Sequence, residues 1–236
     1  MPASHFQFKQ FRVDHDRCAM KVGTDGVLLG AWVTPNQEPK QILDIGTGTA
    51  LVSLMLAQRF SESKITAIEI DPEAAGQAKE NVRASKFAER IKVIEADAMH
   101  WLPPVSPDLI VSNPPFFKHH LKAPDASRTR ARHQKEFDLL EFLRQARSYI
   151  AEGGSMALIM PAGILSEANW SACNCHLARK MAVRPTPNKP PHRELLLLST
   201  SPSETINEPD LVIESNGRHG YSEEYKALTR DFYLHM

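Results

Sequence analysis

The sequence has few cysteines, no excess of charge of either sign and no long apolar run. Three cysteines stand among 236 residues and none forms a Cys-x-x-Cys pair, which excludes a disulfide scaffold and is typical of a reducing compartment. Lysine plus arginine and aspartate plus glutamate both number 28, so the overall charge indicates no polyanionic partner and any nucleic-acid surface must be local. No segment has the length of a membrane span or the apolar core of a signal peptide. We therefore expect a cytoplasmic protein with no membrane contact.

One cluster in the sequence contains residue types that can bind a metal. Cys173, Cys175 and His176 lie close together in the sequence, but they lack the paired spacing of a structural zinc site. The sequence shows no internal repeat, and its length suits one α/β domain with a full core. We expect a single domain over residues 1–236, no metal and no obligate protein partner.

A glycine-containing turn follows the first strongly apolar run. Ile42-Leu43 leads into Asp44, Gly46 and Gly48, and residues 51–57 then have the apolar spacing of a helix packed on a sheet. Glycines there let the backbone approach a ligand closely, next to the amides of a helix N-terminus. Leu51 stands where the dinucleotide-binding fingerprint has its third glycine, which argues against hydride chemistry.

Two acidic side chains follow the next two predicted strands. Glu69 ends the strand that begins at Ile65, and Asp97 closely follows the strand 91–94. A carboxylate at the carboxyl edge of such a strand can accept hydrogen bonds from both hydroxyls of a ribose, as expected of Glu69. Asp97 is placed to accept one from an adenine amino group. The turn and these acids together predict a nucleoside-containing ligand.

A proline-rich turn follows the strand 109–111. In Asn113-Pro114-Pro115-Phe116 the prolines fix φ and donate no hydrogen bond. The side-chain oxygen of Asn113 and the carbonyl of Pro114 can therefore hold the N–H groups of a planar nitrogen, and Phe116 can stack on the planar group, such as a flipped base. The alternative is a stiff loop without chemistry, because short motifs match by accident.

Four signals in this order resemble one family. The Asp44-x-Gly46-x-Gly48 turn, Glu69, Asp97 and the turn at Asn113 are similar to class I S-adenosylmethionine-dependent methyltransferases that methylate amino groups. Segments 6–11, 16–26, 29–32 and 221–233 extend the similarity to a bacterial family that methylates N6 of adenosine 37 in tRNA1(Val). The resemblance implies S-adenosylmethionine as cofactor, tRNA as substrate, and Asn113, Pro114 and Phe116 as the catalytic residues. Asn113 is also expected to contact the cofactor.

The resemblance gives the N-terminal segment a role and shows one departure. Lys21, Thr24 and Asp25 are expected to line the methionine end of the cofactor, in a lid segment over residues 1–35 that precedes a catalytic core over 36–236. The alternative is a surface turn with a helix starting at Thr24. Ala50 replaces a third glycine found in many relatives; we expect it in a helical first turn, with weak consequences.

Basic residues concentrate after the proline-rich turn. This run, beside the expected pocket, predicts phosphate contacts with RNA, although a solvated loop is the usual meaning of a basic run. The residues expected to bind the substrate are Pro115, Lys118, Arg128, Arg130, Arg132 and His133. A second basic group surrounds the prolines 185–191 and either extends this groove or forms a stiff exposed loop: Arg179, Lys180, Arg184, Lys189, His192 and Arg193.

Strand and helix patterns alternate along the chain, which predicts a parallel sheet covered on both faces. An acidic cap at Asp138 predicts a helix to about Tyr149, and later strands are expected near 156–160, 181–183, 195–198 and 211–213. The resemblance implies a Rossmann-like, mostly parallel sheet of seven strands. Its first and fourth strands would flank the point where strand order reverses, so that the Asp44 turn and the Asn113 turn meet there.

Three other functions remain open on the sequence. A protein glutamine N5-methyltransferase uses a similar turn, a DNA adenine methyltransferase fits the chemistry, and a non-enzymatic RNA-binding module fits the basic run. Phe116 and the basic run argue against the first, and the absence of a separate target-recognition domain argues against the second. The third leaves the acidic residues without a role, because carboxylates repel phosphate. In the favoured reaction the methyl group moves in line to the base without metal, covalent intermediate or general base.

Overall fold

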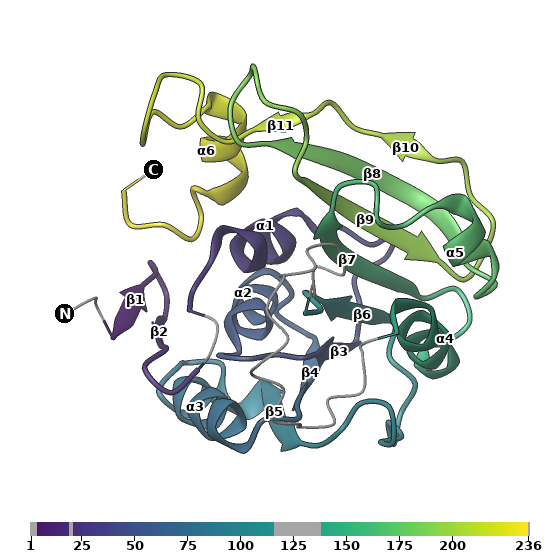
Figure 1. The fold of residues 1–236 in the computed structure, drawn as a ribbon. Helices are drawn as coiled ribbons and strands as arrows, with labels where there is room; N and C mark the ends of the chain where they lie inside the picture. The colour runs from purple at the N-terminus through teal and green to yellow at the C-terminus, as the bar shows by residue number, and fades with distance from the viewer. Residues whose placement is uncertain (1–3, 19–20, 116–137, 236) are drawn as a thin grey trace, which may run out of the picture.

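The computed structural model describes residues 4–18, 21–115 and 138–235, and is built around one large sheet with helices on both faces (Figure 1). The strands are β1 (His5–Gln7), β2 (Arg12–Asp14), β3 (Gln41–Ile45), β4 (Lys64–Glu69), β5 (Ile91–Glu95), β6 (Leu109–Ser112), β7 (Ser155–Pro161), β8 (His176–Arg184), β9 (Arg193–Ser199), β10 (Ile206–Asn207) and β11 (Leu211–Val212). The helices are α1 (Thr24–Trp32), α2 (Leu51–Arg59), α3 (Pro72–Arg83), a 3-10 turn (Ala88–Arg90), α4 (Leu139–Tyr149), α5 (Glu167–Ser171) and α6 (Glu223–Thr229).

The sheet has the strand order β10-β8-β9-β7-β6-β3-β4-β5, and β11 pairs with β8 beside β10. The neighbours from β7 through β5 are all parallel, whereas β9 is antiparallel to both β7 and β8. This confirms the expected mostly parallel sheet. The seven longer strands match the predicted number, and the two-residue strands β10 and β11 are additions along β8. The order reverses between β3 and β6, where ligands bind in open sheets of this kind.

The central strands are buried on both faces and alternate between two hydrophobic clusters. Ile42 of β3 belongs to the cluster that contains α1 and α2, whereas Leu43 belongs to the cluster that contains α4. On β6, Leu109 and Val111 face the first cluster and Ile110 faces the second. This two-residue alternation is what the pleat of a strand imposes. Asp44 lies between such apolar neighbours, so its carboxylate is buried.

Local capping residues explain where two helices start. Asp71 accepts a hydrogen bond from the amide of Ala74, and Pro72 occupies the first turn of α3. Asp138 accepts bonds from the amides of Leu140 and Glu141, which confirms the acidic cap predicted for α4. Among the described residues, no helix has the length and apolar character needed to cross a lipid bilayer.

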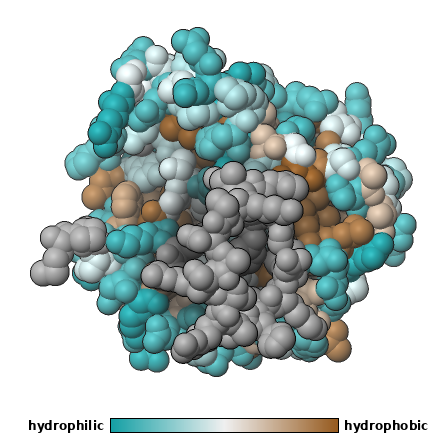
Figure 2. Space-filling model, viewed as in Figure 1, coloured by the Kyte–Doolittle hydropathy of each residue, from teal (hydrophilic) through white to brown (hydrophobic). Residues whose placement is uncertain are grey.

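The ends of the chain pack together beside α1. Phe8 pairs with Tyr233 in an isolated bridge, and its ring stacks on that of Tyr233 at 5.8 Å between centroids. In α1, every residue from Gly26 to Trp32 is buried, and its side chains join the hydrophobic cluster of α2. Within the segment 1–35, α1 is thus part of the core, and of the described residues of this segment Lys21 and residues 23–26 contribute to the cavity treated below. At the surface, hydrophobic side chains gather beside the sheet, while the outer rim is mainly hydrophilic (Figure 2).

Candidate active site

The turn after β3 is held against the end of β4. Gly46 and Gly48 have φ angles of 71° and 55°, a left-handed conformation that glycine adopts without strain. The amides of Gly46 and Thr47 both donate to the carbonyl of Ile68 at 2.9 Å. The backbone therefore turns sharply at the carboxyl edge of the sheet and leaves open space above it.

Ala50 closes this turn in an unexpected conformation. It is the residue before α2, and its φ of 64° places it in the left-handed region. The expectation of a helical first turn at Ala50 is therefore wrong. The amide of Ala50 donates to the carbonyl of Thr47, and the methyl group is fully buried in the core, so the tight turn and its packing hold the residue in this conformation.

Asp44 is a buried carboxylate that faces the turn. Thr47 Oγ1 and Ser53 Oγ donate to its Oδ2 at 2.6 and 2.7 Å. Burial raises the pKa of Asp44 to about 6, although the bonds from Thr47 and Ser53 lower it. A cation beside Asp44 would compensate for the desolvation, so the geometry favours a positively charged ligand group here.

Glu69 connects the glycine turn with the end of β4. Its Oε2 accepts from the amide of Gly48 at 2.8 Å, and its Oε1 accepts from the amides of Ile70 and Asp71 at 3.0 and 3.1 Å. A carboxylate has about four acceptor positions, so one remains for a ligand hydroxyl. Ile70, next in sequence, is 64% exposed; sequence reasoning missed it as a candidate apolar surface for a ligand, although an isoleucine just after the acid was visible.

Asp97 lies beside Glu69, at the end of the neighbouring strand. The amide of Ala96 donates to the carbonyl of Glu69 at 2.9 Å, which joins the two strand ends. Asp97 Oδ1 accepts from the amide of Met99, and Oδ2 lies 2.8 Å from Nδ1 of His100. Glu69 and Asp97 thus form an acidic edge that adjoins the glycine turn without lining the cavity described below.

Asn113 follows β6, at the other side of the point where strand order reverses. Ser112 Oγ donates to the carbonyl of Ile45 at 2.8 Å, which fixes the end of β6 against the end of β3. The side-chain oxygen of Asn113 is buried, and no hydrogen-bond donor reaches it among the described residues. Such an acceptor is unfavourable unless a ligand supplies an N–H or O–H group. Pro114 is buried and Pro115 is exposed.

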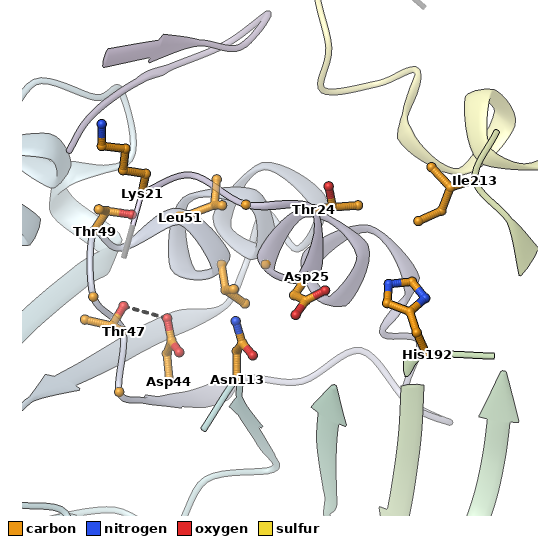
Figure 3. A pocket seen from close by; sticks show the side chains of 15 residues that line it. Lys21, Thr24, Asp25, Asp44, Thr47, Thr49, Leu51, Asn113, His192 and Ile213 are labelled. Atoms are coloured by element: carbon orange, nitrogen blue, oxygen red, sulfur yellow. Dashed lines mark hydrogen bonds between the residues drawn. The ribbon is translucent and has the colours of Figure 1, made fainter. Parts of the chain in front are cut away.

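A cavity of about 360 Å³ brings the two turns together (Figure 3). Six of the residues proposed for the cofactor line it with Asn113: Lys21, Thr24, Asp25, Asp44, Gly46 and Gly48. In Figure 3 the Lys21 side chain extends away from Asp44 and Asn113. Sequence reasoning missed Thr47, Thr49, Leu51 and Ile213 as cavity residues. No local signal marks Ile213, because it reaches the cavity from the far end of the chain.

Asp25, which lines the cavity, is paired with a residue far away in the sequence. Arg193 Nε donates to Asp25 Oδ2 at 2.7 Å, and about a quarter of each side chain is exposed. His192, next to Arg193, lines the same cavity. The start of β9 therefore forms the wall that faces α1.

Most cations of the second basic group are already paired. Arg179 pairs with Glu208, Lys180 with Glu194 at 2.7 Å, and Arg184 with Asp210 at 2.5 Å. These partners cancel much of the local positive charge, which weakens the case for a phosphate-binding groove at β8. The other predicted RNA-binding residues after the turn lie outside the described residues, as does Phe116: Lys118, Arg128, Arg130, Arg132 and His133.

No group of three or more histidine, cysteine or acidic side chains gathers as a metal site within residues 4–18, 21–115 and 138–235. Cys173 and Cys175 are buried, and burial raises the pKa of both thiols, that of Cys175 to about 11. A thiol must ionise to bind a metal, so these two cysteines belong to the core beside α4.

Comparison with known proteins agrees with this geometry. The sequence profile of the methyltransferase small domain matches residues 22–169. The chain belongs to this methyltransferase family. The methyltransferase is 45% identical over 234 residues to a protein of Bacteroides thetaiotaomicron named tRNA1(Val) (adenine(37)-N6)-methyltransferase, covering 98% of both chains. A protein of the same name from Tolumonas auensis is 45% identical over 239 residues, covering 100% of this chain and 99% of the relative.

Solved structures support the fold alone. A predicted O-methyltransferase of Agrobacterium tumefaciens superposes with a TM-score of 0.67 at 20% identity, covering 88% of this methyltransferase and 96% of that chain. A methyltransferase of Pyrococcus furiosus superposes with a TM-score of 0.53 at 19% identity, covering 75% of this methyltransferase and 81% of that chain. The shared part is the sheet with its helices, which agrees with the predicted class I fold.

Proposed function

We propose that this methyltransferase transfers a methyl group from S-adenosylmethionine to N6 of an adenosine in tRNA, at position 37 of tRNA1(Val). The observation that carries the proposal is Asn113, which lines the cavity beside the glycine turn and whose buried side-chain oxygen has no donor among the described residues. The names of the full-length relatives support the choice of tRNA over other amine substrates. A tRNA substrate would place the enzyme in the cytoplasm.

The side chains around the glycine turn have the chemistry that the cofactor needs. The buried Asp44 would stabilise a positively charged ligand. Its raised pKa reflects the desolvation of the carboxylate, which a nearby cation would offset. The glycine turn leaves room for close approach, and Glu69 and Asp97, at the ends of the next two strands, are proposed to accept from the ribose and the adenine. When bound, S-adenosylmethionine supplies a methyl group on a positively charged sulfur. Lys21, Thr24 and Asp25 are proposed to cover the methionine end.

The acceptor side needs two oxygens for one amino group. The side-chain oxygen of Asn113 and the carbonyl of Pro114 are proposed to accept from the two N–H groups of the adenine N6, which favours the pyramidal nitrogen needed for attack. Phe116 is proposed to stack on the flipped base and Pro115 to contact the substrate. Lys118, Arg128, Arg130, Arg132 and His133 are proposed to bind RNA phosphates.

The proposal is tested by supplying labelled S-adenosylmethionine with separate pools of tRNA, DNA and release-factor-like protein. We expect label in tRNA only, and N6-methyladenosine after digestion to nucleosides and mass analysis. Label confined to DNA or to protein glutamine would replace the proposal by one of those activities. No transfer to any pool, with RNA binding retained, would indicate a binding module.

Asn113→Ala tests the residue that carries the proposal. If the amide oxygen holds the amino group in the transition state, turnover falls on the order of a hundredfold while cofactor affinity changes little. Asn36→Ala is the matched control, because Asn36 is exposed and does not line the cavity. Full turnover in Asn113→Ala would contradict the role.

A further inference from the structure

His192 reaches the cavity from a part of the chain that the family profile does not include. It precedes β9, whereas the profile ends at residue 169. The wall that it forms with Ile213 therefore lies outside the part matched by the profile and inside the part that this chain shares with its full-length relatives. Such a wall is suited to recognising the substrate.

The imidazole of His192 is held in one orientation. The backbone amide of His192 donates to the carbonyl of Val183 at 2.9 Å, and its ring Nδ1 lies 3.1 Å from the same oxygen. The backbone carbonyl of His192 accepts from the amide of Ala162 at 3.2 Å and from Arg193 Nη1 at 3.0 Å. Main chain and ring are thus both fixed, as a recognition residue requires.

This arrangement determines what the ring can bind. A carbonyl oxygen only accepts, so Nδ1 carries the hydrogen in the bond to Val183, and Nε2 of the neutral ring is left as an acceptor. No hydrogen bond to Nε2 exists among the described residues. Figure 3 shows one ring nitrogen on the side of Asp25 and Asn113. The cavity therefore presents an acceptor at each end, Asn113 Oδ1 and His192 Nε2.

The separation of the two acceptors suits a nucleoside. Asn113 follows β6 and His192 precedes β9, with β7 between them, so two strand spacings put roughly 10 Å between the backbones. The register pairs Ser112 with Leu158 and Arg193 with Pro161, an offset of three residues or roughly 10 Å along β7. Both residues line the cavity in this interval, and a nucleoside, measured from its amino group to its sugar, has the length to bridge it.

We propose that His192 Nε2 accepts a hydrogen bond from the 2′-hydroxyl of the target adenosine, and so distinguishes RNA from DNA. This inference rests on the proposed function, in which the amino group of the adenine is taken by Asn113 and Pro114. Within a polynucleotide, the 2′-hydroxyl is then the one remaining N–H or O–H donor of that nucleoside. DNA lacks this hydroxyl and leaves Nε2 without its donor.

The test uses two RNA stem-loops that differ by one atom. One contains adenosine at the target position and the other 2′-deoxyadenosine, and kcat/KM is measured for both. We expect the wild-type enzyme to prefer the ribonucleotide about tenfold, the effect of one hydrogen bond. His192→Ala should lose about tenfold on the ribonucleotide and little on the deoxynucleotide, so its preference falls towards one.

Two further variants separate recognition from structure. His192→Gln keeps an acceptor oxygen and should restore part of the preference. His176→Ala is the matched control, because His176 is exposed and pairs with Ser199 at the other end of β9; it should keep the wild-type preference. Thermal unfolding and cofactor affinity, measured on each variant, show whether the fold and the cofactor site are intact.

The outcomes distinguish this inference from the function on which it rests. Equal loss on both substrates in His192→Ala, an unchanged preference in that variant, or equal wild-type activity on both stem-loops would overturn the role of His192 and leave adenosine methylation standing. A wild-type enzyme that methylates neither stem-loop nor tRNA would overturn the proposed function itself.

Discussion

At one end of the cavity, Asp44 accepts hydrogen bonds from Thr47 and Ser53, which lie three and nine residues further along the chain. At the other end, Asp25 accepts from Arg193, 168 residues away. The first end is formed by one continuous segment, from β3 through the turn to α2, whose side chains hydrogen-bond to one another. The second exists only when the start of β9 and α1 come together. The difference teaches that the Asp44 end is a local structure, whereas the Asp25 end is assembled from distant parts of the chain.

Asp44→Asn should give the largest effect at the local end. The folded-state pKa of about 6 lies above the ordinary value of 3.8, so ionisation of Asp44 opposes folding. This penalty is complete above pH 6 and disappears as the pH falls towards 4. A shift of this size means that ionised Asp44 lowers the free energy of unfolding by on the order of 3 kcal/mol. Urea unfolding at pH 8 should therefore show Asp44→Asn as more stable, with the gain vanishing near pH 4.

The same variant should bind the cofactor more weakly, and wild-type affinity should fall as the pH drops below about 6, where Asp44 becomes protonated. Calorimetric titration across this range measures both effects. Asp16→Asn is the control, because Asp16 is exposed and does not line the cavity. If Asp44→Asn were less stable than wild type at pH 8, the bonds to Thr47 and Ser53 would outweigh desolvation and the account would be wrong.

Gly48→Ala tests the conformation of the turn separately from its packing. An added Cβ would meet nothing within 4 Å, but φ is +55°, so the strain alone should lower the free energy of unfolding by about 1–2 kcal/mol. Gly76→Ala is the matched control: its Cβ also meets nothing within 4 Å, and it lies inside α3, where alanine should stabilise by up to about 1 kcal/mol. Effects of the same sign in both variants would contradict this explanation.

The ion pair at the assembled end should contribute less. A double-mutant cycle with Asp25→Asn and Arg193→Met should give a coupling free energy of about 1 kcal/mol, because both side chains are partly exposed. The exposed pair of Arg12 and Asp14 provides the comparison and should couple more weakly. A coupling at Asp25 and Arg193 no larger than at this surface pair would mean that packing alone holds the start of β9 against α1.

Ala50→Gly should give the smallest effect. Relief of the left-handed conformation gains about 1–2 kcal/mol, whereas loss of the buried methyl group and the greater freedom of the unfolded chain remove a similar amount. Denaturant unfolding should place this variant within about 1 kcal/mol of wild type. A loss well beyond that range would show that the methyl group contributes more than its buried area predicts.

The sequence predicted the parallel strands, the helix after Asp138, and the cavity residues Asp44, Gly46 and Gly48, because period, caps and turn residues are local signals. It did not predict the β1–β2 pair or β10, which are short and bear little pattern. It also did not predict that Ala50 is left-handed, since helix propensity at that position is overridden by the turn. The basic residues of β8 carried no sign of their acidic partners, because those partners lie in β9 and in the segment that follows β10.

The sequence by itself determined which groups are available for chemistry and where the two turns occur, since steric limits on glycine and proline act within a few residues. Only the tertiary structure decided that the side-chain oxygen of Asn113 has no donor within the part of the chain that the structure describes, that Arg193 is paired with Asp25, and that His192 lines the same cavity. Burial and pairing depend on neighbours brought together by the whole sheet. No pattern of adjacent residues encodes them.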